Sequence, residues 1–258
     1  MPAEPIMQIR NVTKTFSRGG EEITVLRDLN LFVAEGEFLG IMGPSGSGKT
    51  TLLNLIAGLD KPNRGEVWIG GQCVSRMSES QLASWRTRNI GFIFQFYHLL
   101  PVLTAYENVE LPLLLLPISS AKRREQVLNA LDLVGLTDRL THRPGQLSGG
   151  QQQRVGIARA IVTDPTLIVA DEPTGDLDSR SAVEILNLMC ELQRGLNKTI
   201  LLVTHDPRAA DRAGRVVHLE KGQLLESAEM QAAGLVPAST GNNGIQIAPD
   251  TQMRREMN

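Results

Sequence analysis

The sequence predicts an α/β protein in which a parallel sheet forms the core and a helical segment is inserted into it. Strand-like apolar runs occur between residues 7 and 71 and return after residue 158, with helix-like segments between them. The intervening stretch, residues 96–158, is mostly helical in pattern. Strands that alternate with helices favour a parallel sheet with helices on both faces.

The first part of the chain contains four strand-like runs separated by glycine turns. They are MQIRNVTKTF, ITVLRDLNLFV, EFLGIMG and GEVWIGG. Between the third and the fourth, KTTLLNLIAGL predicts a helix that opens at a glycine-rich loop and stops near Gly58. Short apolar runs bounded by glycines are typical of strands.

The middle and last parts continue the alternation. SAKRREQVLNALDLVGL places Val127, Leu128, Leu131 and Val134 at helical spacing, which gives one apolar face. Further on, TLIVAD and TILLVTHD predict buried strands, and SRSAVEILNLMCELQRGL predicts the helix between them. Residues 223–258 show no sustained period, so we expect a loosely ordered tail.

Composition indicates a soluble protein whose main partner is not nucleic acid. Of the 258 residues, 41% are hydrophobic and 21% are charged, as in ordinary globular domains. The net charge of −2 gives no global basic surface for nucleic acid. The longest apolar stretch, LPLLLLPI at residues 111–118, contains two prolines and is too short to cross a bilayer. The two cysteines lack metal-ligand spacing, which is typical of reduced cytosolic thiols.

The run GPSGSGKT fits the phosphate-binding pattern G-x-x-x-x-G-K-[ST]. Its glycines let backbone N–H groups converge on phosphate oxygens, and the helix that follows points its positive N-terminus at the same place. Lys49 would supply a charge to the β- and γ-phosphates, and Thr50 a hydroxyl to Mg²⁺. The predicted nucleotide-binding loop comprises Gly43, Pro44, Ser45, Gly46, Ser47, Gly48, Lys49, Thr50 and Thr51.

The strand LIVAD ends in two consecutive carboxylates, Asp171 and Glu172. Placing both at a strand end is costly unless a cation meets them, and nucleotide-bound Mg²⁺ is the natural candidate. Asp171 would hold the metal through water. Glu172 would polarise the attacking water as general base. The alternative, an acidic pair that caps a helix, is disfavoured beside a phosphate-binding loop.

Polar residues also follow two other predicted strands, and an aromatic residue lies in the first. Gln95 follows GFIF, and His205 follows ILLVT. Because the carboxyl ends of parallel strands meet at one edge, Gln95 could reach Mg²⁺ or the attacking water, and His205 the γ-phosphate. Phe16 could stack on adenine or could equally be a core residue.

The run LSGGQ offers a second anion site, because a serine and two glycine N–H groups open a helix. One ATP could hardly meet both loops within one compact chain. Two copies arranged head to tail about a twofold axis would each present this loop to the other's ATP. A simple glycine turn that caps a helix is the alternative. The residues of this second loop are Ser148, Gly149, Gly150 and Gln151.

Taken together, these motifs closely resemble those of the ATP-binding-cassette (ABC) ATPases. The resemblance covers about residues 7–222 and includes the loop sequence GDLD at residues 175–178, where many relatives carry serine and alanine at the first two positions. It implies a P-loop NTPase core of the RecA type (residues 7–95 and 159–222), an N-terminal antiparallel β subdomain and a helical subdomain (residues 96–158). It also implies ATP and Mg²⁺ as cofactors and a homodimer that sandwiches two ATP molecules.

Within that family, the segment QFYHLLPVLTAYENVELPLLL is similar to the corresponding one in lipoprotein-releasing and macrolide-exporting ATPases. This resemblance implies an ATPase subunit held peripherally at the cytoplasmic face of the inner membrane by an integral permease. Residues 96–103 would form the docking surface, unless their leucines belong to the core of the helical subdomain. An ATPase of a signalling complex of the cell-division type is the alternative function. Soluble relatives that act on DNA or ribosomes fit less well.

Overall fold

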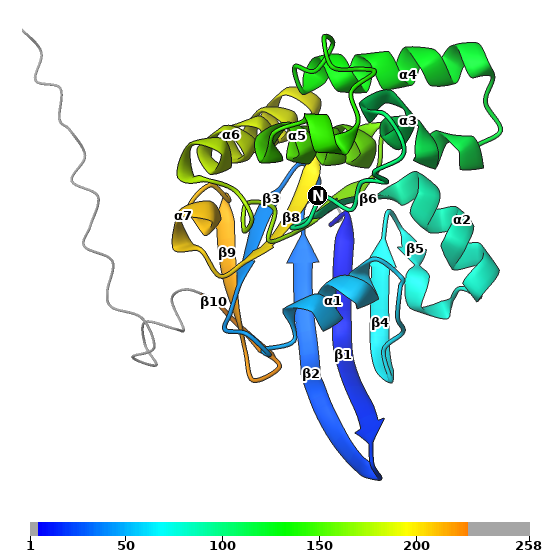
Figure 1. Ribbon diagram of the computed structural model, residues 1–258. Helices are drawn as coiled ribbons and strands as arrows, with labels where there is room; N and C mark the ends of the chain where they lie inside the picture. Colours follow the sequence, from blue (N-terminus) through cyan, green and yellow to red (C-terminus); the bar gives the residue numbers. More distant parts are fainter. Residues whose placement is uncertain (1–4, 227–258) are drawn as a thin grey trace, which may run out of the picture.

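The computed structural model describes residues 5–226, and its strands form two sheets (Figure 1). The first sheet is antiparallel, with the order β2-β1-β4-β5. Its strands are β1 (Met7–Arg18), β2 (Glu21–Val33), β4 (Arg64–Ile69) and β5 (Gln72–Cys73). This sheet is the antiparallel β subdomain that the family resemblance implies.

The second sheet has six strands in the order β10-β9-β3-β8-β7-β6. Strands β9, β3, β8, β7 and β6 run parallel, and β10 pairs antiparallel with β9 at the edge. Their bounds are β3 (Phe38–Met42), β6 (Ile90–Phe94), β7 (Leu167–Asp171), β8 (Thr199–Thr204), β9 (Arg215–Glu220) and β10 (Gln223–Glu226). The predicted parallel core is therefore confirmed.

Most of the longer helices begin with a side chain that caps the helix N-terminus. The helices are α1 (Lys49–Ile56), α2 (Glu79–Asn89), α3 (Ala105–Glu110), α4 (Ser120–Leu133), α5 (Gly149–Ile161), α6 (Ser179–Leu196) and α7 (Pro207–Ala210). Three short 3₁₀ turns accompany them, η1 (Val74–Arg76), η2 (Leu111–Leu115) and η3 (Pro144–Gln146). Ser78, Thr104, Ser148 and Asp178 cap α2, α3, α5 and α6, each by accepting from a backbone N–H of the first turn. Helix α1 begins without a side-chain cap.

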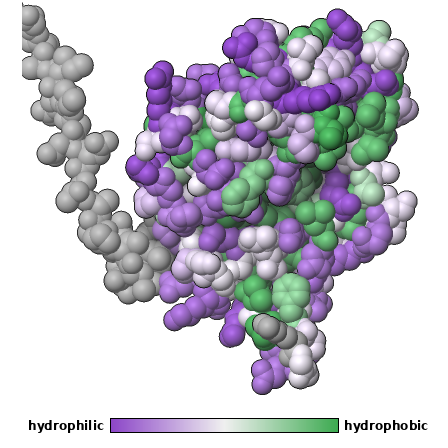
Figure 2. All heavy atoms as spheres, viewed as in Figure 1, coloured by the Kyte–Doolittle hydropathy of each residue, from purple (hydrophilic) through white to green (hydrophobic). Residues whose placement is uncertain are grey.

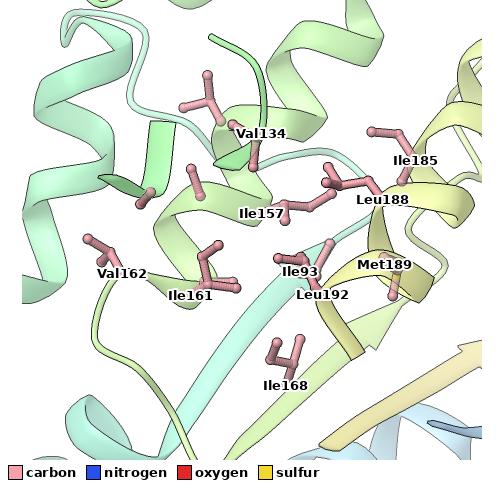
Figure 3. Packing of buried hydrophobic residues seen from close by; sticks show 14 of the residues in the cluster. Ile93, Val134, Ile157, Ile161, Val162, Ile168, Ile185, Leu188, Met189 and Leu192 are labelled. Atoms are coloured by element: carbon pink, nitrogen blue, oxygen red, sulfur yellow. The ribbon is translucent and has the colours of Figure 1, made fainter. Parts of the chain in front are cut away.

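The six-stranded sheet separates two hydrophobic cores. Along β8, Leu201 and Val203 face the antiparallel sheet and α1, whereas Ile200 and Leu202 face the helices α3–α6. Figure 3 shows part of the second core, where residues of α5 and α6 pack over β6 and β7. Because both faces are covered, the central residues of β7 and β8 are apolar, as the sequence indicates, and their polar residues lie at the strand ends.

The elements predicted from sequence are present, and further ones were not predicted. Helices α2 and α7 and strands β5, β9 and β10 are additions. The prediction of a loose tail from residue 223 is wrong for residues 223–226, because the turn at Lys221 and Gly222 folds β10 back onto β9. The remaining tail, residues 227–258, lies outside the described residues.

Candidate functional site

The strand register brings the predicted site residues to one edge of the sheet. Met42 of β3 pairs with Thr204 of β8, and Asp171 of β7 pairs with both Val203 and Phe94. The residues that directly follow these strands are therefore neighbours across the edge. They are Gly43, Gln95, Glu172 and His205.

The loop before α1 is shaped for an anion. Gly48 has a φ of 105°, and a Cβ at Gly43 would overlap the backbone oxygen of Leu219, so both positions need glycine. Because α1 has no side-chain cap, the first N–H groups of the helix lack the partner that other helices have. The Ser47 hydroxyl is buried without a hydrogen bond to any described residue. These unpaired polar groups fit a bound phosphate.

Lys49 lies over the same loop. Its ammonium donates to the backbone oxygens of Gly43 at 2.7 Å and Pro44 at 3.0 Å. These carbonyls keep the charge at the mouth of the loop, where the β- and γ-phosphates of a nucleotide would meet it. Thr50, the next residue, is exposed, which leaves it accessible to a metal bound beside the phosphates.

Asp171 has the electrostatics of a cation-binding carboxylate. Burial raises its pKa, the charge of Glu172 raises it further, and Lys49 opposes the shift. A divalent cation would remove this penalty. Among residues 5–226 no cluster of three or more His, Cys, Asp or Glu side chains forms a metal cage of its own. The candidate donors, the Asp171 carboxylate, the Thr50 hydroxyl and the Gln95 amide, are all oxygen ligands and fit Mg²⁺ that is held mainly by phosphate oxygens.

Glu172 is held in place from three sides. Its backbone adopts a φ of 47°, and its N–H donates to Val203 at 2.9 Å. Its carboxylate accepts from the Thr204 hydroxyl at 3.1 Å and pairs with Nδ1 of His205 at 2.7 Å. The carboxylate only accepts when ionised, so Nδ1 is the donor in that state. A left-handed backbone at a glutamate is strained and typical of functional sites.

Gln95 and the GDLD loop lie against each other. A Cβ at Gly175 would come within 2.8 Å of the Gln95 amide nitrogen, so glycine here leaves room for Gln95. Two residues beyond Gln95, the Tyr97 hydroxyl reaches the Asp176 carboxylate at 3.2 Å. The structure thus brings Gln95 beside the GDLD loop, which the sequence did not predict.

The LSGGQ loop starts helix α5. The Ser148 hydroxyl accepts from the N–H of Gln151 at 3.3 Å, and the Gln151 side chain returns a bond to the N–H of Ser148. Ser148 is exposed, and the N–H groups of Gly149 and Gly150 belong to the first helical turn, which has no intrahelical acceptors. The loop therefore caps a helix, and its role as an anion site stays a prediction.

Phe16 is 42% exposed on β1, which excludes the alternative of a core phenylalanine. Lys14 lies 4.9 Å from the centre of its ring and is itself paired with Asp60 at 2.7 Å. An exposed ring that is held by a neighbouring cation is suitable for stacking on a base.

Sequence reasoning missed two contributors to this edge, Thr204 and Gln153. Thr204 is the last residue of β8, and Gln153 is a fully buried glutamine of α5. A polar residue on the apolar face of a helix is a signal in the sequence, but its partners lie far away in the chain.

Among the described residues, no helix has the length and apolarity that a membrane span needs.

Comparisons with known proteins identify the family of the chain. The family model for ABC transporters matches residues 26–175, more than half of the chain. The chain belongs to the ABC transporter family. This ABC ATPase is 48% identical to the lipoprotein-releasing system ATP-binding protein LolD of Psychrobacter arcticus, with 84% of this chain and 96% of that one covered.

Two further relatives of this ABC ATPase come from curated proteins and solved structures. It is 44% identical to the macrolide export protein MacB of Marinobacter nauticus, over 95% of this chain and 38% of that longer protein. The ATP-binding cassette MJ0796, solved as a dimer in a post-hydrolysis state with ADP and Pi, matches with a TM-score of 0.77 and 44% identity. That match covers 85% of this chain and 98% of the other. The predicted P-loop NTPase fold and ABC family membership are confirmed, and the chain is an ATP-binding subunit of the ABC transporter class.

Proposed function

We propose that this ABC ATPase hydrolyses Mg²⁺-bound ATP between two copies of itself and thereby drives an integral membrane permease. The observation that carries the proposal is the contact of Glu172 with His205 at 2.7 Å, at the sheet edge that also bears the phosphate-binding loop. Residues 7–222 would form the catalytic domain, with residues 96–158 as its helical subdomain.

In this proposal the loop of residues 43–51 binds the phosphates, and Phe16 stacks on the base. Lys49 neutralises charge on the β- and γ-phosphates as the terminal bond breaks. Bound Mg²⁺, held by Thr50, Gln95 and, through water, Asp171, would supply further charge neutralisation there.

Glu172 takes the proton from the attacking water. Its carboxylate keeps lone pairs free beyond those used by Thr204 and His205, so it can accept that proton while both partners fix its direction. His205 would orient the water and the γ-phosphate with Glu172.

The second copy would supply the other half of each site. Ser148, Gly149, Gly150 and Gln151 of one protomer would donate to the γ-phosphate bound by its partner. The dimeric form of the cassette MJ0796, at 44% identity, supports this arrangement.

A permease partner is supported by the relatives and by the surface. The relatives are named as lipoprotein-releasing and macrolide-export proteins. Exposed apolar side chains lie around α3 and η2, where hydrophobic spheres gather on the right of the upper part of Figure 2. They are Phe96, Leu100, Val102, Leu114 and Leu115. Docking there would hold the protein at the cytoplasmic face of the membrane.

The test of the active site is Glu172→Gln, assayed for ATP hydrolysis as purified protein. Loss of the general base should lower kcat by about a hundredfold or more, while ATP-dependent dimers accumulate. Glu184→Gln, on the surface of α6, is the matched control and should keep its kcat. Near-normal hydrolysis by Glu172→Gln would contradict the assignment.

The test of the partner uses the same variant, tagged and held with ATP and Mg²⁺ in gently solubilised native membranes. Co-purification of an integral permease supports the proposal. Recovery of soluble or nucleic-acid partners alone would refute the transport role.

A further inference from the structure

Helix α5 carries one polar side chain into an apolar contact. The helix packs on β6 and β7 through residues such as Ile157 and Ile161, which face Ile93 and Ile168 (Figure 3). On this buried face Gln153 has no exposed surface at all. A leucine or methionine would fill such a place without the cost of burying an amide.

The amide of Gln153 uses its donors to join the ends of two strands. Its Nε2 donates to the backbone oxygen of Phe94 at 3.1 Å and to that of Pro173 at 2.6 Å. The opposite orientation of the amide would set its oxygen against two carbonyl oxygens, so the contacts fix which atom is nitrogen. The oxygen, Oε1, is buried without a hydrogen bond to any described residue. The side chain is therefore suited to donation, and it keeps an unpaired acceptor in order to donate twice.

Both acceptors lie next to residues of the catalytic edge. Phe94 precedes Gln95, and Pro173 follows Glu172. The pairing of β6 with β7 ends at Phe94 and Asp171. Directly beyond this pair, the Gln153 amide connects the two chain segments by its hydrogen bonds to Phe94 and Pro173. The helix that bears Gln153 begins directly after its N-cap residue, Ser148.

We propose that Gln153 is a positioning residue that ties the Ser148 loop to Gln95 and Glu172 of the same protomer. A shift of α5 changes the backbone on both sides of the amide together. Contact of the Ser148 loop with the partner's ATP would then change the position of Glu172, the general base that acts on this protomer's own ATP. This inference rests on the proposed roles of Glu172 and the Ser148 loop.

The first variant is Gln153→Met, which keeps the length of the side chain and removes both donors. Because neither donor touches the phosphate-binding loop, the Kd for ATP should stay within about twofold. The kcat should fall about tenfold or more, since small misplacements of catalytic groups are costly. Gln193→Met is the matched control, because the Gln193 amide also donates to a backbone oxygen, that of Gly36 at 2.6 Å, away from the site. It should lower the Tm and leave kcat unchanged.

The second variant is Gln153→Glu, measured as the ratio of its kcat to that of the wild type across pH. Burial raises the pKa of the new carboxyl, and the protonated form can donate one hydrogen bond in place of two. The ratio should therefore rise as pH falls, whereas the same ratio for Gln153→Met stays flat.

Two results would overturn the inference. One is a kcat for Gln153→Met that matches the wild type. The other is a loss of kcat in Gln153→Met that is fully explained by less folded protein, together with a flat ratio for Gln153→Glu. Glu172→Gln, assayed in parallel, separates this failure from failure of the proposed function, because it tests the general base without touching Gln153.

Discussion

The hydroxyl of Tyr97 donates to the carboxylate of Asp176 across 3.2 Å and 79 residues of sequence. Tyr97 belongs to the segment after Gln95, and Asp176 belongs to the GDLD loop after Glu172. The same hydroxyl lies next to Gly149, where a Cβ would come within 3.0 Å of it. Three motifs far apart in the chain therefore meet at one side chain.

The strength of this contact can be measured with a double-mutant cycle of Tyr97→Phe and Asp176→Ala. Burial raises the pKa of Tyr97 and the Asp176 charge raises it further, so the hydroxyl stays a donor at neutral pH. Urea unfolding of the four proteins should give a coupling of about 0.5–1.5 kcal/mol. Additive effects of the two substitutions would show that the contact adds no stability.

Replacing His205 should impair catalysis more than folding. The side chain is 72% exposed and contacts Glu172, so His205→Ala removes an orienting partner without opening the core. We expect kcat to fall about tenfold to a hundredfold, with a Tm close to that of the wild type. His142→Ala, whose backbone oxygen accepts from Ala105 at the start of α3, is a control that changes the same residue type away from the sheet edge. Equal kcat values for both variants would exclude His205 from the mechanism.

Asp171→Asn should stabilise the protein in the absence of nucleotide. A raised pKa means that the folded state disfavours the charged carboxylate, so Asp171 lowers stability at pH values above its folded pKa, and this effect fades as pH falls from that pKa toward the lower pKa of the unfolded state. The neutral amide should raise the Tm by about 1–4 °C at pH 7.5. At low pH, where Asp171 is protonated, the two Tm values should converge.

The same variant should lose its response to metal. Differential scanning fluorimetry with ATP, with and without Mg²⁺, measures this response. A Mg²⁺-dependent rise in Tm equal to that of the wild type would contradict the assignment of Asp171 to the metal.

Gly43→Ala should weaken ATP binding, whereas Gly195→Ala should stabilise the fold. A Cβ at Gly43 would overlap the oxygen of Leu219 and force the loop to shift, so ATP affinity should fall by about tenfold or more, a loss of about 1.4 kcal/mol. Gly195 lies in the last turn of α6, and an added Cβ would meet nothing within 4 Å beyond the neighbouring helix backbone, so alanine should raise the free energy of unfolding by up to about 0.5–1 kcal/mol. Isothermal titration and thermal melts would check the two expectations.

Local patterns made much of the fold predictable, as well as the shape of the loop before α1. Strands β7 and β8 are buried on both faces, so their residues are apolar except at the strand ends, where Asp171, Thr199 and Thr204 lie. The loop before α1 can be recognised because its glycines are demanded by the backbone itself. Helix α2 escaped prediction because its sequence is largely polar and has no clear apolar face, although the capping pair Ser78 and Gln81 marks its start.

The contacts of Gln153, Tyr97 and Thr204 could not be predicted for a different reason. Each depends on which strand ends become neighbours, and that is decided by the strand order of the sheet rather than by any local pattern. Strand β10 was missed because its pairing with β9 depends on one short turn.

Helix α1 starts without a side-chain cap, so a nucleotide bound there would become a structural component of the helix. Where other helices of this protein carry a serine, threonine or aspartate from their own chain, α1 would take its capping oxygens from a phosphate. Amide hydrogen exchange in its first turn should therefore slow when ATP binds. The first turn of α1 would then be more stable with ATP bound and would open more often without it.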